Sequence, residues 1–313
     1  MIAYIVRRLF STLVVMAVVA FVVFSLLYLT PGDPAAVIAG DIATSEDIQR
    51  IHQRLGLDDP FLVQFGRWAG ALAHGDLGTS IFTNLPVTQL IGQRVEPTLS
   101  LTLCTLVVAI AVAVPLGVVA AAKAGTWFDR AVMAFSVLGF SVPVFVLAYI
   151  LIFTFAVALD WLPVQGYRSI HEGFWPWLRH LILPSIALGT VYVALIARMT
   201  RASMLDVLAQ DYVRTAQAKG LAPDQVLLRH ALKNAAVPIM TIIGIGVALL
   251  ISGVVVTETV FAIPGLGRLT VDAILRRDYP IIQGVILLFS AAYVLVNLAV
   301  DVSYTLLDPR VRY

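Results

Sequence analysis

Charged side chains, lysine and cysteine are all scarce in this chain of 313 residues. Charged residues make up 13% of it and hydrophobic residues 60%, against about 25% and 45–50% in soluble domains. The only lysines are Lys123, Lys219 and Lys233, and none stands in the pattern G-x-x-x-x-G-K-[ST]. This excludes a P-loop ATP site. The composition excludes an ordinary soluble domain and indicates a membrane protein.

Catalytic and metal-binding patterns are also missing from the sequence. Neither G-x-S-x-G nor H-E-x-x-H occurs, and no two of the five histidines are three or four residues apart. A single cysteine, Cys104, excludes a disulfide within the chain. We therefore expect no catalytic residue, no metal site and no cofactor bound by this chain.

Long apolar segments take up much of the chain. At 1.5 Å per residue a helix needs ~20 residues to cross a hydrocarbon core of ~30 Å. Six charge-free runs of about 17 residues or more approach or exceed that length. The first is too long for the apolar part of a signal peptide, so it is predicted to remain as an anchor. The sequence predicts an all-α membrane protein with six transmembrane helices, at Leu9–Gly32, Pro97–Ala122, Ala131–Leu159, Leu181–Ala197, Asn234–Thr257 and Tyr279–Val300.

The distribution of arginine and lysine predicts the orientation of these helices. Six spans place both termini on one side, and that side holds most of the basic residues of the termini and short loops, among them Arg7, Arg8, Arg214 and Lys219. Basic residues in short loops favour the cytoplasmic side. We expect both termini in the cytoplasm.

The segment between the first two spans has the punctuation of a small extracytoplasmic domain. A capped amphipathic helix is predicted from Thr44 or Ser45 to Gly56, and a second helix over Phe61–Leu72. The predicted organisation is residues 1–30 (N-terminus and first span), 31–96 (outer domain), 97–308 (five-helix core, including a cytoplasmic loop at 199–234) and 309–313 (C-terminus).

A polar, charged segment, Asp211–Gly220, lies between the fourth and fifth apolar runs. It contains no proline, and its one glycine, Gly220, stands where a helix can end with a positive φ. We predict a helix closed by Gly220 and a second helix opened by Pro223. A segment of this kind requires a binding partner outside the membrane.

Three other residues near the spans are candidates for gating or translocation. Glu258 and Asp301 are carboxylates at span ends, where intramembrane charge is a functional candidate. Asp301 has the structural alternative of an ion pair with Arg198 or Arg310. Pro143 can kink the third span and free backbone carbonyls, although an ordinary packing kink is the alternative.

Several motifs together resemble the permeases of bacterial ABC importers, in the dipeptide and oligopeptide group. The resemblance covers the chain from end to end. Within that group, the chain is similar to the first of the two permease subunits. It rests on DYVRTAQAKGL at 211–221, PGDP at 31–34, LGLDDP at 55–60, GDLG at 75–78, ETVFAIPGLGRL at 258–269, RDYP at 277–280 and LLDPRVRY at 306–313. The general loop motif of the family is Glu-Ala-Ala, then any three residues, then Gly. In this chain the four specified positions hold Arg214, Thr215, Ala216 and Gly220. Because the glutamate is absent, its role in the family cannot be assigned to this chain.

The resemblance implies a type I ABC importer permease fold, a place in the bacterial inner membrane as a multi-pass protein, and a subunit that hydrolyses nothing. It implies four partners besides the bilayer, and no nucleic acid: a second permease subunit, two cytoplasmic ATPases that bind ATP and Mg, and an extracytoplasmic binding protein. The residues implied in ATPase coupling are Asp211, Tyr212, Arg214, Thr215, Ala216, Lys219, Gly220 and Leu221. Ala216 and Gly220 are expected to seat closely in a partner groove.

The implied substrate is a short peptide. Within the same family, importers of nickel chelates, glutathione and other small solutes remain alternatives. Outside it, the alternatives are a secondary transporter driven by an ion gradient through Asp301 or Glu258, and an intramembrane enzyme, which the missing catalytic patterns disfavour.

Overall fold

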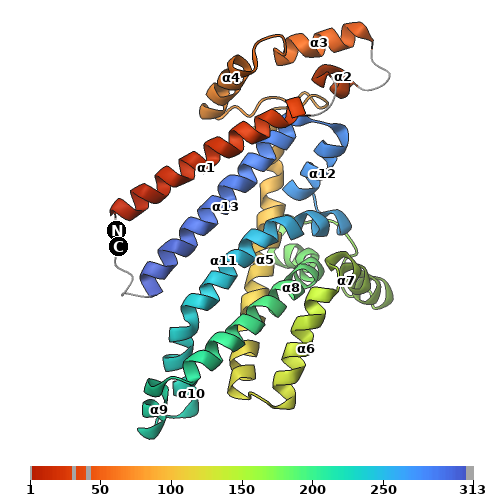
Figure 1. The fold of residues 1–313 in the computed structure, drawn as a ribbon. Helices are drawn as coiled ribbons and strands as arrows, with labels where there is room; N and C mark the ends of the chain where they lie inside the picture. Colours follow the sequence, from red (N-terminus) through yellow and green to blue (C-terminus); the bar gives the residue numbers. More distant parts are fainter. Residues whose placement is uncertain (1, 30–32, 40–43, 308–313) are drawn as a thin grey trace. The chain divides into compact units, whose positions relative to one another are not determined.

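The computed structural model describes residues 2–29, 33–39 and 44–307, and these residues are mostly helical (Figure 1). No β-strand forms in these ranges, although Thr79 and Pro86 make a single antiparallel bridge. The chain divides into two compact units, residues 1–95 with 268–295 and residues 96–267 with 296–313. The predicted all-α class is confirmed.

The first unit contains four helices and parts of three more. The four are α1 (Ile2–Leu29), α2 (Pro34–Ala39), α3 (Ser45–Leu55) and α4 (Phe61–Ala73). The helices α5 (Val87–Ala122), α12 (Leu266–Arg276) and α13 (Tyr279–Leu307) contribute residues to both units.

Aromatic rings hold α4 against α1. Phe21, Phe24 and Tyr28 of α1 meet rings of α4 at centroid distances of 5.0 to 5.8 Å, mostly edge to face. Such pairs add about 0.5–1.5 kcal/mol each beyond the area that they bury. The cluster fixes α4 beside the last turns of α1.

The predicted capped helix and its glycine stop are confirmed. Thr44 accepts a hydrogen bond from the backbone N–H of Asp47, whose carboxylate in turn accepts from the N–H of Thr44, and α3 begins at Ser45. Gly56 ends the helix at φ +62°, a conformation that costs glycine little. The second predicted helix, Phe61–Leu72, is also confirmed as α4.

The RDYP motif holds the loop that follows α4. The Asp278 carboxylate, 2% exposed, accepts from the Ser80 hydroxyl at 2.5 Å and from the N–H of Ile81 at 3.3 Å. Asp278 also leads into α13, which begins at Tyr279. The RDYP motif and the loop after α4, which are distant in sequence, therefore contact each other within the first unit.

The second unit is organised around α8 (Phe174–Leu208), which packs against α6 (Trp127–Ser141), α7 (Val144–Leu151) and α11 (Leu232–Val260). Small residues let these helices approach closely, as is typical of membrane helix pairs. A Cβ at Gly139 would lie 3.0 Å from that of Ala194, and one at Gly117 would lie 2.6 Å from that of Thr200.

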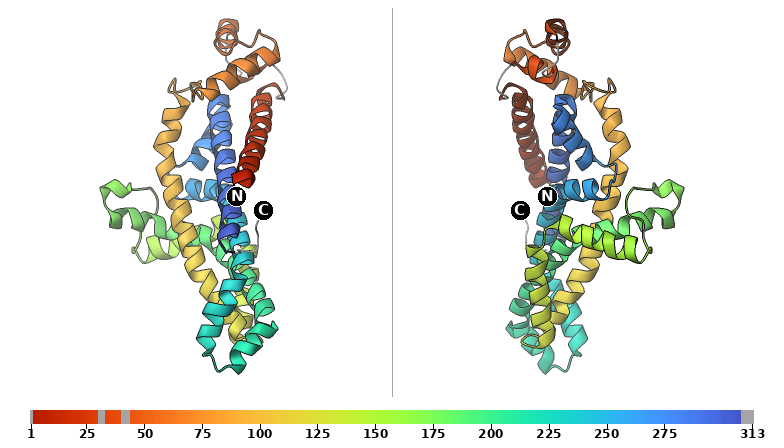
Figure 2. Two further views of the ribbon diagram at one scale, coloured as in Figure 1. Left: turned by 90° about the vertical axis from the view of Figure 1, so that its left-hand side faces the viewer. Right: turned by 90° about the vertical axis from the view of Figure 1, so that its right-hand side faces the viewer.

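The third predicted span is broken rather than kinked (Figure 2). Proline at 143 disfavours helical φ and ψ in the residue before it, and Val142 is extended at φ −89° and ψ +121°. α6 ends at Ser141, and α7 begins at Val144 and continues as a π-helix, η1 (Ile152–Ala158), with a bend of 103° at the break. Among the residues that the structure describes, five helices are long and apolar enough to cross a membrane, and the bent pair makes six if it counts as one span.

Several helices extend beyond the apolar runs that predict them. α5 begins at Val87 instead of Pro97, and α8 covers residues 174–208 instead of 181–197. A charge-free run marks the part suited to hydrocarbon, whereas helical hydrogen bonding continues through polar turns. α2 and α12 have no counterpart among the predicted elements. The PGDP motif at 31–34 lies partly outside the described residues.

Candidate functional site

The predicted polar helix exists as α9 (Asp211–Ala218), within a hairpin that joins two long helices. α8 ends at Leu208, and the chain continues after α9 into α10 (Pro223–Gln225), a π-helical turn η3 (Val226–Ala231) and α11. The irregular connection is therefore far shorter than the predicted loop at 199–234, because both neighbouring helices extend into it. We call residues 209–225 the coupling hairpin.

An apolar cluster holds the hairpin together from inside. Val213, Ala216 and Val226 are 0%, 8% and 2% exposed. Around them pack Val207, Leu208 and Leu221. An isolated helix of eight residues is marginal in water, so this cluster and the helix caps are what maintain α9.

Gly220 closes the helix as predicted, at φ +78°. Its N–H donates to the carbonyl of Gln217 at 2.9 Å, and the N–H of Leu221 donates to that of Ala216 at 3.4 Å. This is the Schellman arrangement, in which the residue after the glycine also makes an apolar contact with the last turn. Pro223 occupies the first turn of α10, where its missing N–H costs nothing.

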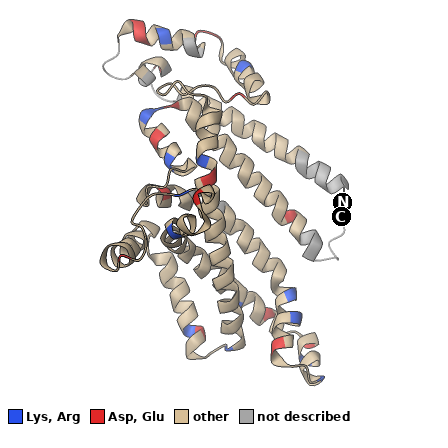
Figure 3. Ribbon diagram, turned by 180° about the vertical axis from the view of Figure 1, so that it is seen from behind, with Lys and Arg blue, Asp and Glu red and all other residues tan. Residues whose placement is uncertain are grey.

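The opposite face of α9 is exposed and polar. The side chains of Asp211 and Arg214 are 97% and 72% exposed and lie 3.6 Å apart. Tyr212 is 45% exposed, and Thr215 and Lys219 are exposed as well. Figure 3 shows basic residues around this hairpin. Tyr212, Thr215 and Lys219 share one helical face, and we call these three residues the outer face.

The position of Ala216 differs from the prediction, which placed its side chain against a partner. Its methyl group is buried in the cluster with Val213 and Val226, because residues 213 and 216 are one helical turn apart and point inward together. Gly220 is exposed, and a Cβ at this position would meet no atom within 4 Å. Of the two small residues, only Gly220 remains accessible.

An ion pair that the sequence reasoning missed ties α8 to α6. Asp129, 3% exposed, pairs with Arg201 through both carboxylate oxygens, with Nη2 to Oδ2 at 2.7 Å. It also accepts from the N–H of Gly125 at 2.9 Å. A bidentate arginine–carboxylate pair fixes orientation as well as distance. In the sequence, the only indication of this ion pair is the carboxylate of Asp129, two residues before the third apolar run.

Glu258 lies in a buried cluster made by the motif at 258–269 and Thr98 of α5. It is fully buried and accepts from the hydroxyl of Thr98 at 2.6 Å, while that oxygen accepts from the N–H of Leu266 at 2.8 Å. Gly265 and Gly267 pack so closely that a Cβ on Gly265 would collide with the carboxylate. The PGLG turn is therefore folded around Glu258, and its glycines are required by space.

The other two gating candidates have different surroundings. Asp301 is half-buried near the end of α13. Arg198 lies over the ring of Phe140, 5.7 Å from its centroid, and makes no ion pair with Asp301; Arg310 lies outside the described residues. Pro143 is exposed at the break between α6 and α7, beside an apolar cavity of about 170 Å³ lined by Gly139, Val142 and Thr190 among others.

Known families match nearly the whole chain. Residues 113–313 match the family described as "Binding-protein-dependent transport system inner membrane component", and residues 1–102 match its N-terminal counterpart. The "Probable peptide ABC transporter permease protein y4tP" of Sinorhizobium fredii is 57% identical over 99% of both chains. The "Glutathione transport system permease protein GsiC" of Escherichia coli O6:H1 is 43% identical over all of both.

A solved structure supports the fold. The MetNI methionine ABC transporter, in an inward-facing conformation, aligns with a TM-score of 0.59 and 18% identity over 71% of this chain and 97% of its own. At that identity the similarity shows the fold alone, which is that of type I importer permeases.

Proposed function

Because the chain belongs to the family of inner membrane components of binding-protein-dependent transport systems, we propose that it is a permease subunit of an ATP-driven importer of short peptides. It lines half of the translocation path and itself hydrolyses nothing. A second permease subunit, two ATPases and an extracytoplasmic binding protein complete the importer. ATP and Mg bind to the ATPases. Both termini and the coupling hairpin face the cytoplasm.

The observation that carries this proposal is the construction of the coupling hairpin. Its inner face is an apolar cluster within the chain, and its outer face offers Tyr212, Thr215 and Lys219 to solvent. A short helix presented on the ends of two long helices is suited to seat in a groove of a partner. An aromatic ring flanked by a hydroxyl and a cation gives such a contact both area and polarity.

The connections of the hairpin explain how movement of a partner reaches the membrane. α8 enters the hairpin and packs on α6, α7 and α11, and the Asp129–Arg201 pair couples α8 to α6. The exit passes through η3, and π-helical turns frequently mark functional sites. Closure of the ATPases would shift α8 and α11 as packed units, which is the shear form of a domain movement. Alternating access follows from that shift.

Peptide transport is proposed from the relatives, whose names include peptide and glutathione permeases. Competition for uptake by the assembled importer separates the alternatives. Unlabelled dipeptides and tripeptides should compete with a labelled dipeptide, and a nickel chelate should not. Competition by glutathione alone would redirect the proposal to that branch of the family.

A bulky side chain on the outer face tests the coupling. Thr215→Trp in the assembled importer should reduce ATP-dependent uptake strongly while the chain still inserts and assembles. Ala124→Trp is the matched control, because Ala124 is also a small exposed residue but lies in the turn between α5 and α6. Full uptake by Thr215→Trp would contradict the proposal, and ion-driven uptake by this chain alone would establish a secondary transporter instead.

A further inference from the structure

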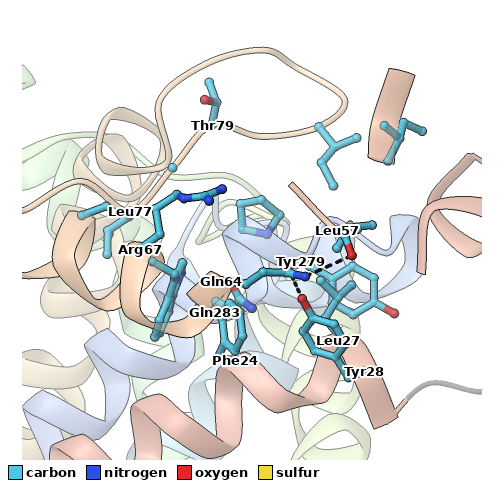
Figure 4. A pocket seen from close by; sticks show the side chains of 16 residues that line it. Phe24, Leu27, Tyr28, Leu57, Gln64, Arg67, Leu77, Thr79, Tyr279 and Gln283 are labelled. Carbon is cyan, nitrogen blue, oxygen red and sulfur yellow. Dashed lines mark hydrogen bonds between the residues drawn. The ribbon is translucent and has the colours of Figure 1, made fainter. Parts of the chain in front are cut away.

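A cavity in the first unit is not explained by the coupling role. Its volume is about 330 Å³, and it lies among the end of α1, α4, the 77–81 loop and the start of α13 (Figure 4). Its walls are largely aromatic and aliphatic. The rings come from Phe24, Tyr28, Trp68 and Tyr279.

Two glutamine side chains line this cavity in different states. Gln64 donates to the carbonyls of Leu57 at 3.1 Å and Asp59 at 2.7 Å and accepts from the Tyr28 hydroxyl. Gln283, only 7% exposed, has no hydrogen-bond partner among the residues that the structure describes. Its amide atoms are not among the fully buried polar atoms that lack a hydrogen bond, so they are accessible from the cavity that the residue lines. They are therefore available to a ligand in the cavity.

The position of the cavity indicates the kind of ligand. Tyr28 is the last residue of one candidate membrane span and Tyr279 the first residue of another, so the cavity lies at the level of the lipid headgroups, where tyrosine and tryptophan are enriched. α4 exposes Leu62 and Val63, which are 73% and 50% exposed, as an amphipathic helix at a membrane surface does.

The span of α1 that ends at Tyr28 carries no charged residue from Phe10 onward. Leu13, which is 67% exposed, lies on the same helical face as the cavity residues Phe24, Leu27 and Tyr28. An acyl chain that left the cavity along this face would meet no charged side chain of α1. The cavity volume is at the lower end of the range for ligand pockets, ~300–1,000 Å³, so it suits a headgroup and the start of a chain.

The charged residues of the cavity lining indicate which chemical group the ligand carries. Arg67 lines the cavity, and its Nη2 lies 2.6 Å from Asp59, which leaves other N–H donors of the guanidinium available. Arginine is well suited to bind phosphate. The described lining contains no Asp or Glu, so a peptide would find a partner for its carboxylate and none for its ammonium group.

We propose that this cavity binds one membrane phospholipid. Arg67 binds the lipid phosphate, and the Gln283 amide donates to a phosphate or ester oxygen. The aromatic rings contact the glycerol and the first methylenes. The lipid completes the hydrogen bonding of Gln283 and joins α1, α4 and α13 within the first unit.

Thermal unfolding of the purified importer in detergent tests this site, with and without added phosphatidylethanolamine. Gln283→Leu and Arg67→Gln should each lower the apparent affinity for the stabilising lipid by about tenfold or more, as expected for one charge-assisted hydrogen bond. Gln283→Leu should not lower the Tm without lipid, because the Gln283 amide makes no hydrogen bond to the residues that the structure describes. Gln89→Leu and Arg50→Gln are matched controls, since Gln89 is exposed outside the cavity and Arg50 is an exposed arginine paired with Asp47.

Three further ligands, namely diacylglycerol, inorganic phosphate and a dipeptide, test which chemical group produces the thermal stabilisation. Diacylglycerol with the same chains and inorganic phosphate should each stabilise far less than the phospholipid. If diacylglycerol matched the phospholipid, or if the cavity variants responded to lipid like the controls, the proposal would be overturned. Stabilisation by a dipeptide that both cavity variants abolish, without a phospholipid effect, would instead make the cavity a peptide site.

Discussion

Gly220→Ala perturbs the coupling hairpin through backbone conformation alone. Gly220 has φ +78°, and a Cβ built on it meets no atom within 4 Å. The alanine therefore fits sterically, and the cost is that of placing an L-residue in the left-handed region, about 1–2 kcal/mol. A change of that size shifts a conformational equilibrium roughly 5–30-fold.

That cost is large compared with what holds α9 in place. Burial of a valine side chain such as Val213 contributes roughly 1.5–3 kcal/mol, and the helix is only eight residues long. We expect Gly220→Ala to lower the population of the docked hairpin and to reduce ATP-dependent uptake several-fold at limiting ATPase concentration. Insertion and abundance of the chain should remain unchanged, because the apolar helices are untouched.

Gly220→Asn is the control for this experiment. Asparagine tolerates the left-handed conformation better than alanine does, although it is the larger residue. Uptake and the apparent affinity for the ATPases should therefore rank glycine first, asparagine second and alanine last. If asparagine were as damaging as a large apolar residue, or alanine were neutral, the backbone argument would be refuted.

The remaining predictions concern buried contacts and one partly buried histidine. Gly265→Ala should destabilise the second unit by about 1–3 kcal/mol, the usual cost of overpacking, because its Cβ would collide with the Glu258 carboxylate; a Tm equal to the wild type would contradict it. Asp129→Asn should impair uptake more than ATPase binding, and a pull-down with the ATPases measures the second; equal losses would refute a role in transmission. The Nε2–H of His52 donates to the Asp33 carboxylate at 2.9 Å, and this hydrogen bond raises the pKa of His52. The stabilisation of α2 and α3 is therefore full below pH ~6.5 and is lost as the pH rises through the raised pKa. Hydrogen exchange across α3, corrected for its intrinsic pH dependence, should report this, and His52→Gln should not show it.

The elements that local signals specify were predictable from the sequence. Thr44 and Gly56 bound α3, Gly220 closes α9 and Pro223 opens the next turn, each through a backbone requirement of one residue. The apolar runs located the membrane helices, although they gave their ends poorly because polar residues such as Asp206 continue α8.

Contacts between distant residues could not be predicted in this way. Nothing local pairs Asp129 with Arg201, or Thr98 with Glu258, because sequence periodicity does not rotate one helix against another. The inward position of Ala216 was missed for a related reason: the small residue suggested close approach to a partner, whereas Val226, across the turn, provides the surface on which it packs. Pro143 was expected to kink a span, and its effect on Val142 breaks it.

Cysteine cross-linking between the coupling hairpin and the ATPase subunits tests the central claim most directly. Cys104 is the chain's single cysteine, so Cys104→Ser provides a cysteine-free background. With Tyr212→Cys or Thr215→Cys in that background, a short bifunctional thiol reagent should join the chain to an ATPase subunit carrying cysteines at its surface groove, and Ala216→Cys, which is buried, should not react. Free labelling of Tyr212→Cys in the assembled importer, without any cross-link to an ATPase, would contradict the account.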